Sequence, residues 1–473
     1  MTDTALLLEK TISEVAPLIQ RGEISPVDLL EAQLARIATY DGQLRSFITV
    51  TAELAHQQAE AAARDVAAGR YRGPLHGIPI GLKDLICTRG IRTTCASPLL
   101  ADFRPLLDAA VTTRLAEAGA VCVGKLNLTE FALVGYHPTL PYPRNPWHTD
   151  YWAGVSSSGS GVATAASLCF AALGSDTGGS IRFPATACGV VGLKPTFGKV
   201  SRHGVFPLAD TLDHLGPMAR SVRDCALLLA VLEGRDERDP ATRSDPAVDY
   251  LAEIARGIQG LRIGIDRDYC GNGADEAQRE AVFRACYILK GLGAEFVEVD
   301  LSGLNDACDH WLTLCAVDAL LRHREWFPER AGEYGPTFRS LLEHGLTCTA
   351  EDYARAQRQR MATSALLANL FTRVDCLLFP ATPAPAPLQA DMPPDMVVVP
   401  EAVPNLVRFT GPTDMSGHPS LTVPNGFTPQ GLPTAMQFIG RLGDEATVLR
   451  AGAAYEAATA WHTRRPVLHA AES

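Results

Sequence analysis

Two clusters of glycine and hydroxylated residues could together form a catalytic site. The first is Gly154–Gly161, GVSSSGSG, and the second is Gly174–Ser180, GSDTGGS. In the second cluster Ser180 directly follows two glycines. Backbone N–H groups can then face outward beside the serine oxygen, as an oxyanion hole requires. A serine nucleophile also needs a base, and the nearest histidines, His148 and His203, lie outside both clusters.

A serine- and glycine-rich turn or a phosphate cradle would use the same residue types. The phosphate cradle lacks support, because neither a G-x-x-x-x-G-K-[ST] motif nor a G-x-G-x-x-G motif between a strand and a helix occurs here. Most isolated Gly-Gly-Ser triplets are turns. The two clusters alone therefore do not decide between a turn and a catalytic loop.

The sequence around these clusters resembles the signature of the amidase signature family of serine hydrolases. The resemblance continues through Ser180–Ala185, SIRFPA, and Cys188–Thr196, CGVVGLKPT. Upstream, Gly77–Asp84, GIPIGLKD, matches the G-x-P-x-x-x-K-D context of the family's lysine. Similar stretches run from about residue 23 to the C-terminus, with the closing motifs PSLTVP at 419–424 and GLP at 431–433, and are weakest over roughly 300–400.

The resemblance implies a serine–cis-serine–lysine triad. The nucleophile maps to Ser180, the bridging serine with a cis peptide bond to Ser156, and the base to Lys83. The 24-residue separation of the two serines matches the family spacing. Val155 and Ser158 replace two glycines of the family's usual first cluster, and we expect Val155 to narrow the site.

The resemblance also implies roles for the residues around the triad. Ser157 and Asp176 are expected to support the lysine and the loop, and Arg182 to pair with an acid nearby. The oxyanion is expected to be held by four backbone N–H groups, those of Thr177, Gly178, Gly179 and Ser180.

A lysine can act as the base only when it is neutral, and burial lowers its pKa. Lys83 lies in an apolar run that includes Ile78, Ile80 and Leu82, which is consistent with such burial. Lys125 and Lys194 are rival lysines. Lys194 follows the nucleophile within the signature, so we assign it a structural role.

We expect a stand-alone hydrolase that cleaves the C–N bonds of small linear amides through an acyl-enzyme. The alternative is a carbamate, urethane, urea-derivative or ester hydrolase with the same triad, since all these reactions pass through a tetrahedral oxyanion. A protein that merely binds an anion with the serine loops is disfavoured by the specific triad spacing.

A further alternative is the glutaminase subunit of a tRNA-dependent amidotransferase, which must hold the charged groups of glutamine. Tyr353–Arg360, YARAQRQR, resembles the arginine-bearing helix of such glutaminases. The acidic partner expected before Phe409 is missing, because Val407 and Arg408 stand there.

The substrate pocket is expected to be apolar and to bind an acyl or aryl group. By the layout that the family resemblance implies, its candidate walls are Phe131, Tyr136, Phe197 and Phe409, together with the proline-rich loop 380–404, which could act as a lid. Packing in the core is the alternative for each of these aromatic residues.

Short apolar runs alternate with helical patterns, which predicts an α/β fold; the resemblance implies a central mixed β-sheet flanked by helices on both faces. We expect a single domain over 1–473, with an N-terminal helical segment at 1–68 and an α/β core at 69–473. The expected strands are Ile78–Leu82, Val121–Val123, Leu168–Leu173, Leu261–Ile265, Phe296–Val299, Cys376–Phe379, Ser420–Val423 and Ala435–Ile439. The expected helices of the core are 108–118, 160–167, 221–232, 275–291, 351–371 and 444–458.

Composition narrows the class of protein further. The chain of 473 residues is 47% hydrophobic and 20% charged, as in folded proteins, and its net charge is −11. That charge argues against non-specific binding to nucleic acid or to an anionic membrane. The 12 cysteines include no C-x-x-C pair, so we expect reduced thiols, no metal, no cofactor and a cytoplasmic location. A homodimer stays an option.

Overall fold

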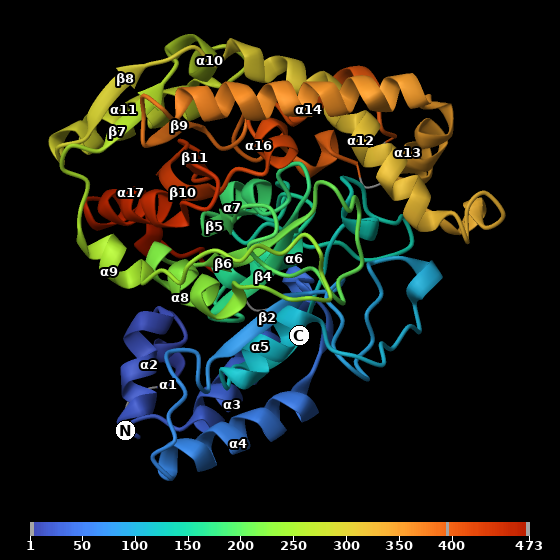
Figure 1. Ribbon diagram of the computed structural model, residues 1–473. Helices are drawn as coiled ribbons and strands as arrows, with labels where there is room; N and C mark the ends of the chain where they lie inside the picture. Colours follow the sequence, from blue (N-terminus) through green and yellow to red (C-terminus); the bar gives the residue numbers. More distant parts are fainter. Residues whose placement is uncertain (1–3, 394–396, 470–473) are drawn as a thin grey trace.

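The structure, a computed structural model, describes residues 4–393 and 397–469. Its centre is a mixed sheet of eleven strands in the order β1-β3-β2-β4-β6-β5-β10-β11-β9-β7-β8, covered by helices (Figure 1). The predicted α/β architecture with a mixed sheet is therefore confirmed. No helix in the described part of the chain is long and apolar enough to cross a membrane.

The strands are β1 Phe47–Val50, β2 Pro79–Lys83, β3 Val121–Leu126, β4 Ala171–Asp176, β5 Val191–Lys194, β6 His214–Ala219, β7 Arg262–Ile265, β8 Glu295–Glu298, β9 Cys376–Pro380, β10 Ser420–Phe427 and β11 Pro433–Gly440. The helices are α1 Thr4–Leu7, α2 Ile12–Gln20, α3 Pro26–Leu44, α4 Ala52–Ala67, α5 Ala110–Glu117, α6 Ser158–Ala165, α7 Arg182–Cys188, α8 Val222–Leu232, α9 Tyr250–Ala255, α10 Arg267–Gly271, α11 Glu276–Gly291, α12 Asn305–His323, α13 Pro336–Thr347, α14 Ala350–Leu370, α15 Val403–Leu406, α16 Gly411–Ser416 and α17 Glu445–Ala457.

The parallel strands β2 and β4 position the catalytic candidates. They are neighbours in the sheet, with Leu82 opposite Leu173. Because parallel strands end at the same edge, the residues that end β2 and β4, Lys83 and Asp176, leave the sheet at the same edge. Both strands are buried along their whole length, so the lysine enters an interior that excludes water.

The N-terminal region is not purely helical, contrary to the prediction for 1–68. Phe47–Val50 forms β1, which pairs antiparallel with β3 through Phe47 and Leu126. This strand has only four residues, and they are partly exposed. Its sequence therefore shows no clear alternation of apolar and polar side chains. The helices around it, α2, α3 and α4, lie together at one end of the molecule, opposite α12–α14 (Figure 1).

Several elements near the site differ from the prediction. Strand β4 begins at Ala171 rather than Leu168, because Ser167, with φ 57°, lies in the turn that follows α6. The prediction omitted α7, which carries Pro184 in its first turn, and also α12. These two helices both contribute side chains to the site.

Candidate active site

Lys83, the last residue of β2, is the centre of the candidate site. It is fully buried, and its Nζ lies 2.7 Å from the hydroxyl of Ser156, 2.8 Å from that of Ser157 and 2.8 Å from that of Ser175. Burial lowers the pKa of Lys83 to about 7. At neutral pH a large fraction of this amine is therefore unprotonated and can accept a proton.

The hydroxyls around Lys83 have different tasks. The Ser157 hydroxyl donates to the carbonyl of Ser175 at 3.1 Å, so its oxygen is left to accept from Lys83. A neutral amine donates two hydrogen bonds and accepts one. Ser156 is therefore free to point its proton at the lysine nitrogen. The prediction did not include Ser175, which stands one residue before Asp176 in the second cluster.

The two serine clusters meet at residues 155–157 and 180. The Val155–Ser156 peptide bond is cis, as the family resemblance implies. The N–H of Ser157 donates to the carbonyl of Ser180 at 3.1 Å. Val155 and Ser180 line the same cavity. The Lys83–Ser156 half of the predicted triad is thus hydrogen-bonded, and the Ser157 backbone joins Ser180 to it, while in the described residues no hydrogen bond links the Ser180 hydroxyl to Ser156 or Lys83.

Asp176 holds the loop that carries Ser180. Its carboxylate accepts hydrogen bonds from the N–H groups of Gly179 at 2.6 Å and Ile181 at 2.9 Å. It is also paired with Arg182, whose Nη2 lies 2.9 Å from it. Burial would raise the pKa of Asp176, but the Arg182 guanidinium holds it below its usual value. The loop is therefore anchored by a carboxylate that stays charged.

Arg182 lies between two acids, as the sequence predicts in part. Its Nη2 is 2.6 Å from Asp414 and 2.9 Å from Asp176, and all three side chains are fully buried. Asp414 belongs to α16, far along the chain, and no local signal pointed to it. Removing one member of such a buried cluster leaves charge without compensation.

Replacing Arg182 with methionine is therefore expected to lower the free energy of unfolding by about 3–5 kcal/mol. Arg262→Met serves as the matched control, because the Arg262 and Asp375 side chains are 40% and 24% exposed. Its loss should cost about 1 kcal/mol or less. Urea unfolding of both variants measures the difference. Equal losses would contradict the anchoring role of Arg182.

The backbone of the second cluster can bind an oxyanion at three positions. Within residues 4–393 and 397–469, the N–H groups of Thr177, Gly178 and Ser180 have no hydrogen-bond acceptor. The predicted fourth donor, Gly179, is wrong in this structure, because its N–H already donates to Asp176 at 2.6 Å. Three of the four predicted donors are thus free of an acceptor in the described residues, and the fourth is not.

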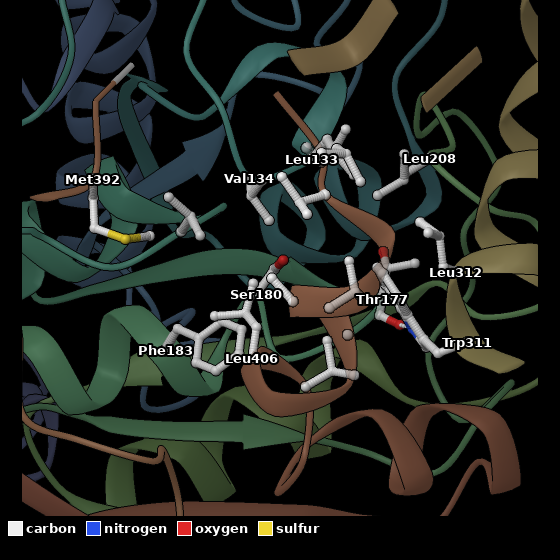
Figure 2. A pocket seen from close by; sticks show the side chains of 18 of the residues that line it. Leu133, Val134, Thr177, Ser180, Phe183, Leu208, Trp311, Leu312, Met392 and Leu406 are labelled. Atoms are coloured by element: carbon white, nitrogen blue, oxygen red, sulfur yellow. Dashed lines mark hydrogen bonds between the residues drawn. The ribbon is translucent and has the colours of Figure 1, made fainter. Parts of the chain in front are cut away.

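An apolar cavity of about 240 Å³ opens onto Ser180. Figure 2 shows the Ser180 hydroxyl pointing into it, with Met392 on one side and Leu312 and Trp311 on the other. The described residues that line it are Ala132, Leu133, Val134, Val155, Thr177, Gly178, Ser180, Phe183, Leu208, Trp311, Leu312, Met392, Val397, Val398, Val399, Ala402, Val403, Leu406 and Val407.

The loop 380–404 does form a wall of this cavity, as predicted, through Met392 and the three valines 397–399. The opposite wall comes from α12, through Trp311 and Leu312. The prediction missed α12, although Cys308, Trp311 and Cys315 repeat at helical spacing. That spacing indicates a helix, but nothing in it shows that the helix faces Ser180.

The four aromatic residues predicted to line the pocket do not line it. Phe131 packs in the core against Phe338, with ring centroids 5.0 Å apart. Phe409 packs against Tyr269, with centroids 5.4 Å apart. Both side chains are 1% exposed. Their apolar character serves core packing, which the sequence could not distinguish from a pocket wall.

Tyr136 and Phe197 also lie outside the cavity lining. The Tyr136 hydroxyl donates a hydrogen bond to the Ser158 hydroxyl at 2.9 Å and so supports the first serine cluster. Phe197 packs edge-on against His214, with ring centroids 5.5 Å apart. The pocket is therefore apolar, as predicted. Its apolar lining consists of aliphatic residues, Phe183 and Trp311, and not of the four predicted aromatic residues.

The two rival lysines are bonded elsewhere. Lys125 lies 3.1 Å from Asp84 and donates to Thr93 at 2.7 Å. Lys194 donates to the carbonyl of His418 at 2.6 Å. Neither has a hydrogen bond to Ser156 or Ser180 in the described part of the chain.

A buried lysine that reaches a serine, a second serine that faces a cavity, and free backbone N–H groups are together the parts of a serine hydrolase. The amidase family model matches residues 28–449. The chain belongs to this family.

Similar sequences and a similar solved structure support this family assignment. The putative amidase AmiD of Mycobacterium tuberculosis is 42% identical over 455 residues, which cover 96% of this chain and 95% of that protein. A glutamyl-tRNA(Gln) amidotransferase subunit from Roseiflexus is 40% identical over 489 residues, with 98% and 99% covered. A solved bacterial aryl acylamidase of the amidase signature family has a TM-score of 0.88 at 25% identity, with 97% and 99% covered.

Proposed function

We propose that this protein is a stand-alone hydrolase that cleaves the C–N bond of small linear amides with an apolar acyl group. The observation that carries the proposal is the position of Ser180. Its hydroxyl opens into an apolar cavity, and the same loop presents three unbonded N–H groups. The acyl group would fill the cavity, and the leaving amine would face the serine relay.

The chemistry follows from the contacts of Lys83. Neutral Lys83 takes a proton from Ser156, which takes the proton of Ser180 as its oxygen attacks the amide carbonyl. The free N–H groups stabilise the oxyanion that forms. Ser156 then gives a proton to the leaving nitrogen as the C–N bond breaks, and Lys83 returns its proton to Ser156, which leaves the lysine neutral again. Water repeats the sequence on the acyl-enzyme and releases the acid.

The contacts of Arg360 and Arg408 count against the glutaminase alternative. Arg360 donates to the backbone carbonyls of Met415, at 2.7 Å, and Thr211. Arg408 donates to Asn305 at 2.8 Å. None of the described residues that line the cavity is charged. Glutamine would therefore lose the solvation of two charges without gaining partners.

The pH dependence of the reaction follows from the pKa of Lys83. Only neutral Lys83 acts as a base, and its pKa is about 7. We expect kcat/KM to rise by about tenfold per pH unit below that pKa and to level off above it. Steady-state assays between about pH 5 and pH 9 measure this rise of kcat/KM and its plateau. A profile that falls as the pH rises through 7 would contradict a lysine base.

A substrate panel tests the proposed specificity. The chain, purified alone, is assayed on acyl amides of increasing length, on the matching carbamates, ureas and esters, and on glutamine. We expect the highest kcat/KM among the apolar acyl amides and negligible turnover of glutamine. A preference for glutamine would overturn the proposal, and a preference for carbamates or ureas would replace the amide by that bond.

A further inference from the structure

The backbone of residues 176–179 is anchored at every carbonyl. Each of its four carbonyl oxygens accepts a hydrogen bond from a different residue. The four bonds run to Asp176 from His214 Nδ1 at 3.2 Å, to Thr177 from Trp311 Nε1 at 2.8 Å, to Gly178 from Thr410 Oγ1 at 2.6 Å and to Gly179 from Phe183 N at 2.7 Å.

These bonds also set the directions of the N–H groups. A trans peptide unit is planar, so a fixed carbonyl fixes the N–H of the next residue on the opposite side. The Thr177 carbonyl therefore determines where the N–H of Gly178 points. That N–H has no acceptor in the described part of the chain, whereas the N–H of Gly179 is bound to Asp176. The donor on the Thr177 carbonyl is Trp311.

Trp311 also touches the loop and the cavity directly. Its indole packs so closely on Gly178 that a Cβ atom there would lie 2.5 Å from Cζ2 of the ring. The same side chain lines the cavity beside Leu312 (Figure 2). One rigid ring thus contacts the space for the acyl group and the peptide unit that supplies an oxyanion donor.

We infer that Trp311 is a positioning residue that aims the Gly178 N–H at the oxyanion and couples the fit of the acyl group to it. The inference rests on the proposed function, because it assigns Gly178 to the transition state of that reaction. A donor misdirected by a few tenths of an ångström stabilises the transition state less, while the acyl group still binds. The loss of the indole N–H should therefore lower kcat and leave KM nearly unchanged.

The test compares two replacements of Trp311. Trp311→Phe keeps an aromatic ring and removes the N–H. Incorporation of benzothienylalanine at 311 keeps the bicyclic shape and replaces the N–H by sulfur. We expect both to lower kcat by about tenfold or more, with KM within about twofold.

A ligand pair provides the readout that a merely structural role would not move. An alkyl boronic acid forms a tetrahedral adduct on a serine and places an oxygen in the oxyanion hole. An alcohol of the same chain length fills only the cavity. The benzothienylalanine variant, which keeps the bicyclic ring that lines the cavity, should weaken the boronic acid by the same factor as kcat/KM and leave the alcohol unaffected. Leu312→Ala, which lines the cavity without a bond to the loop, should weaken both ligands equally.

The possible outcomes separate the inference from the proposed function. If the wild-type protein hydrolyses amides and the benzothienylalanine variant keeps its kcat and its boronic acid affinity, the positioning role of Trp311 is wrong. If only Trp311→Phe loses activity, ring packing explains the loss and the hydrogen-bond role is again wrong. If the wild-type protein neither hydrolyses amides nor forms the boronic acid adduct, the proposed function fails first and the inference with it.

Discussion

Replacing Ser180 with alanine is expected to abolish amide hydrolysis and to leave the fold intact. The side chain is small and faces a cavity, so its loss leaves no buried charge and creates no unpaired partner. The attacking oxygen disappears, and kcat should fall by about 10⁴-fold or more. The expected melting temperature is within about 2 °C of the wild type.

Ser160→Ala is a matched control for this change. Ser160 is also buried and lies in the first cluster, but its hydroxyl donates to the carbonyl of Leu173 at 2.9 Å. We expect it to lower the free energy of unfolding by about 1 kcal/mol with kcat nearly unchanged. If Ser180→Ala retains more than about a tenth of the wild-type rate, the assignment of the nucleophile is wrong.

Replacing Lys83 with methionine is expected to have the second largest effect. Methionine has a similar length but no proton acceptor, and Ser156 then has no route for its proton. The kcat should fall by about 10³-fold to 10⁴-fold, with KM changed little. Three hydroxyls also lose the partner they share. The measurement is kcat at pH 9, where wild-type Lys83 is neutral.

Lys83→Arg separates charge from basicity. A guanidinium keeps donors near the serines but stays protonated at any accessible pH. We expect this variant to be as inactive as Lys83→Met. Its residual kcat/KM should not rise with pH near pH 7, as the wild-type kcat/KM does. Substantial activity of Lys83→Arg would contradict proton transfer to the lysine and would reduce residue 83 to a structural donor.

The members of the proposed triad could be named from the sequence because each lies in its own contiguous motif. The partners that complete the site could not. Asp414 and Trp311 meet the second cluster only through the fold, from helices more than 100 residues away in the chain. An acid or a tryptophan in such a helix has no local pattern that reveals its distant contact.

Among the strands, too, some could be predicted from the sequence and others could not. Apolar runs predicted β2, β9 and β11 closely, because strands buried on both faces are mostly apolar. The prediction missed β1, which is short and half exposed, and also the buried strands β5 and β6. For Phe131 and Phe409 the residue type correctly indicated burial. It could not show whether the side chain is buried in the core or in a pocket wall, since both environments bury the same side chains.

The central claim, that Ser180 is activated by Lys83 through Ser156, is tested most directly by covalent labelling. The protein is treated with a fluorophosphonate, digested and analysed by mass spectrometry, and the labelling rate is followed against pH. The account predicts one label per chain, on Ser180, with a rate that rises through the Lys83 pKa of about 7 and is lost in Lys83→Met. A label on another serine, or equally fast labelling of Ser180 in Lys83→Met, would contradict it.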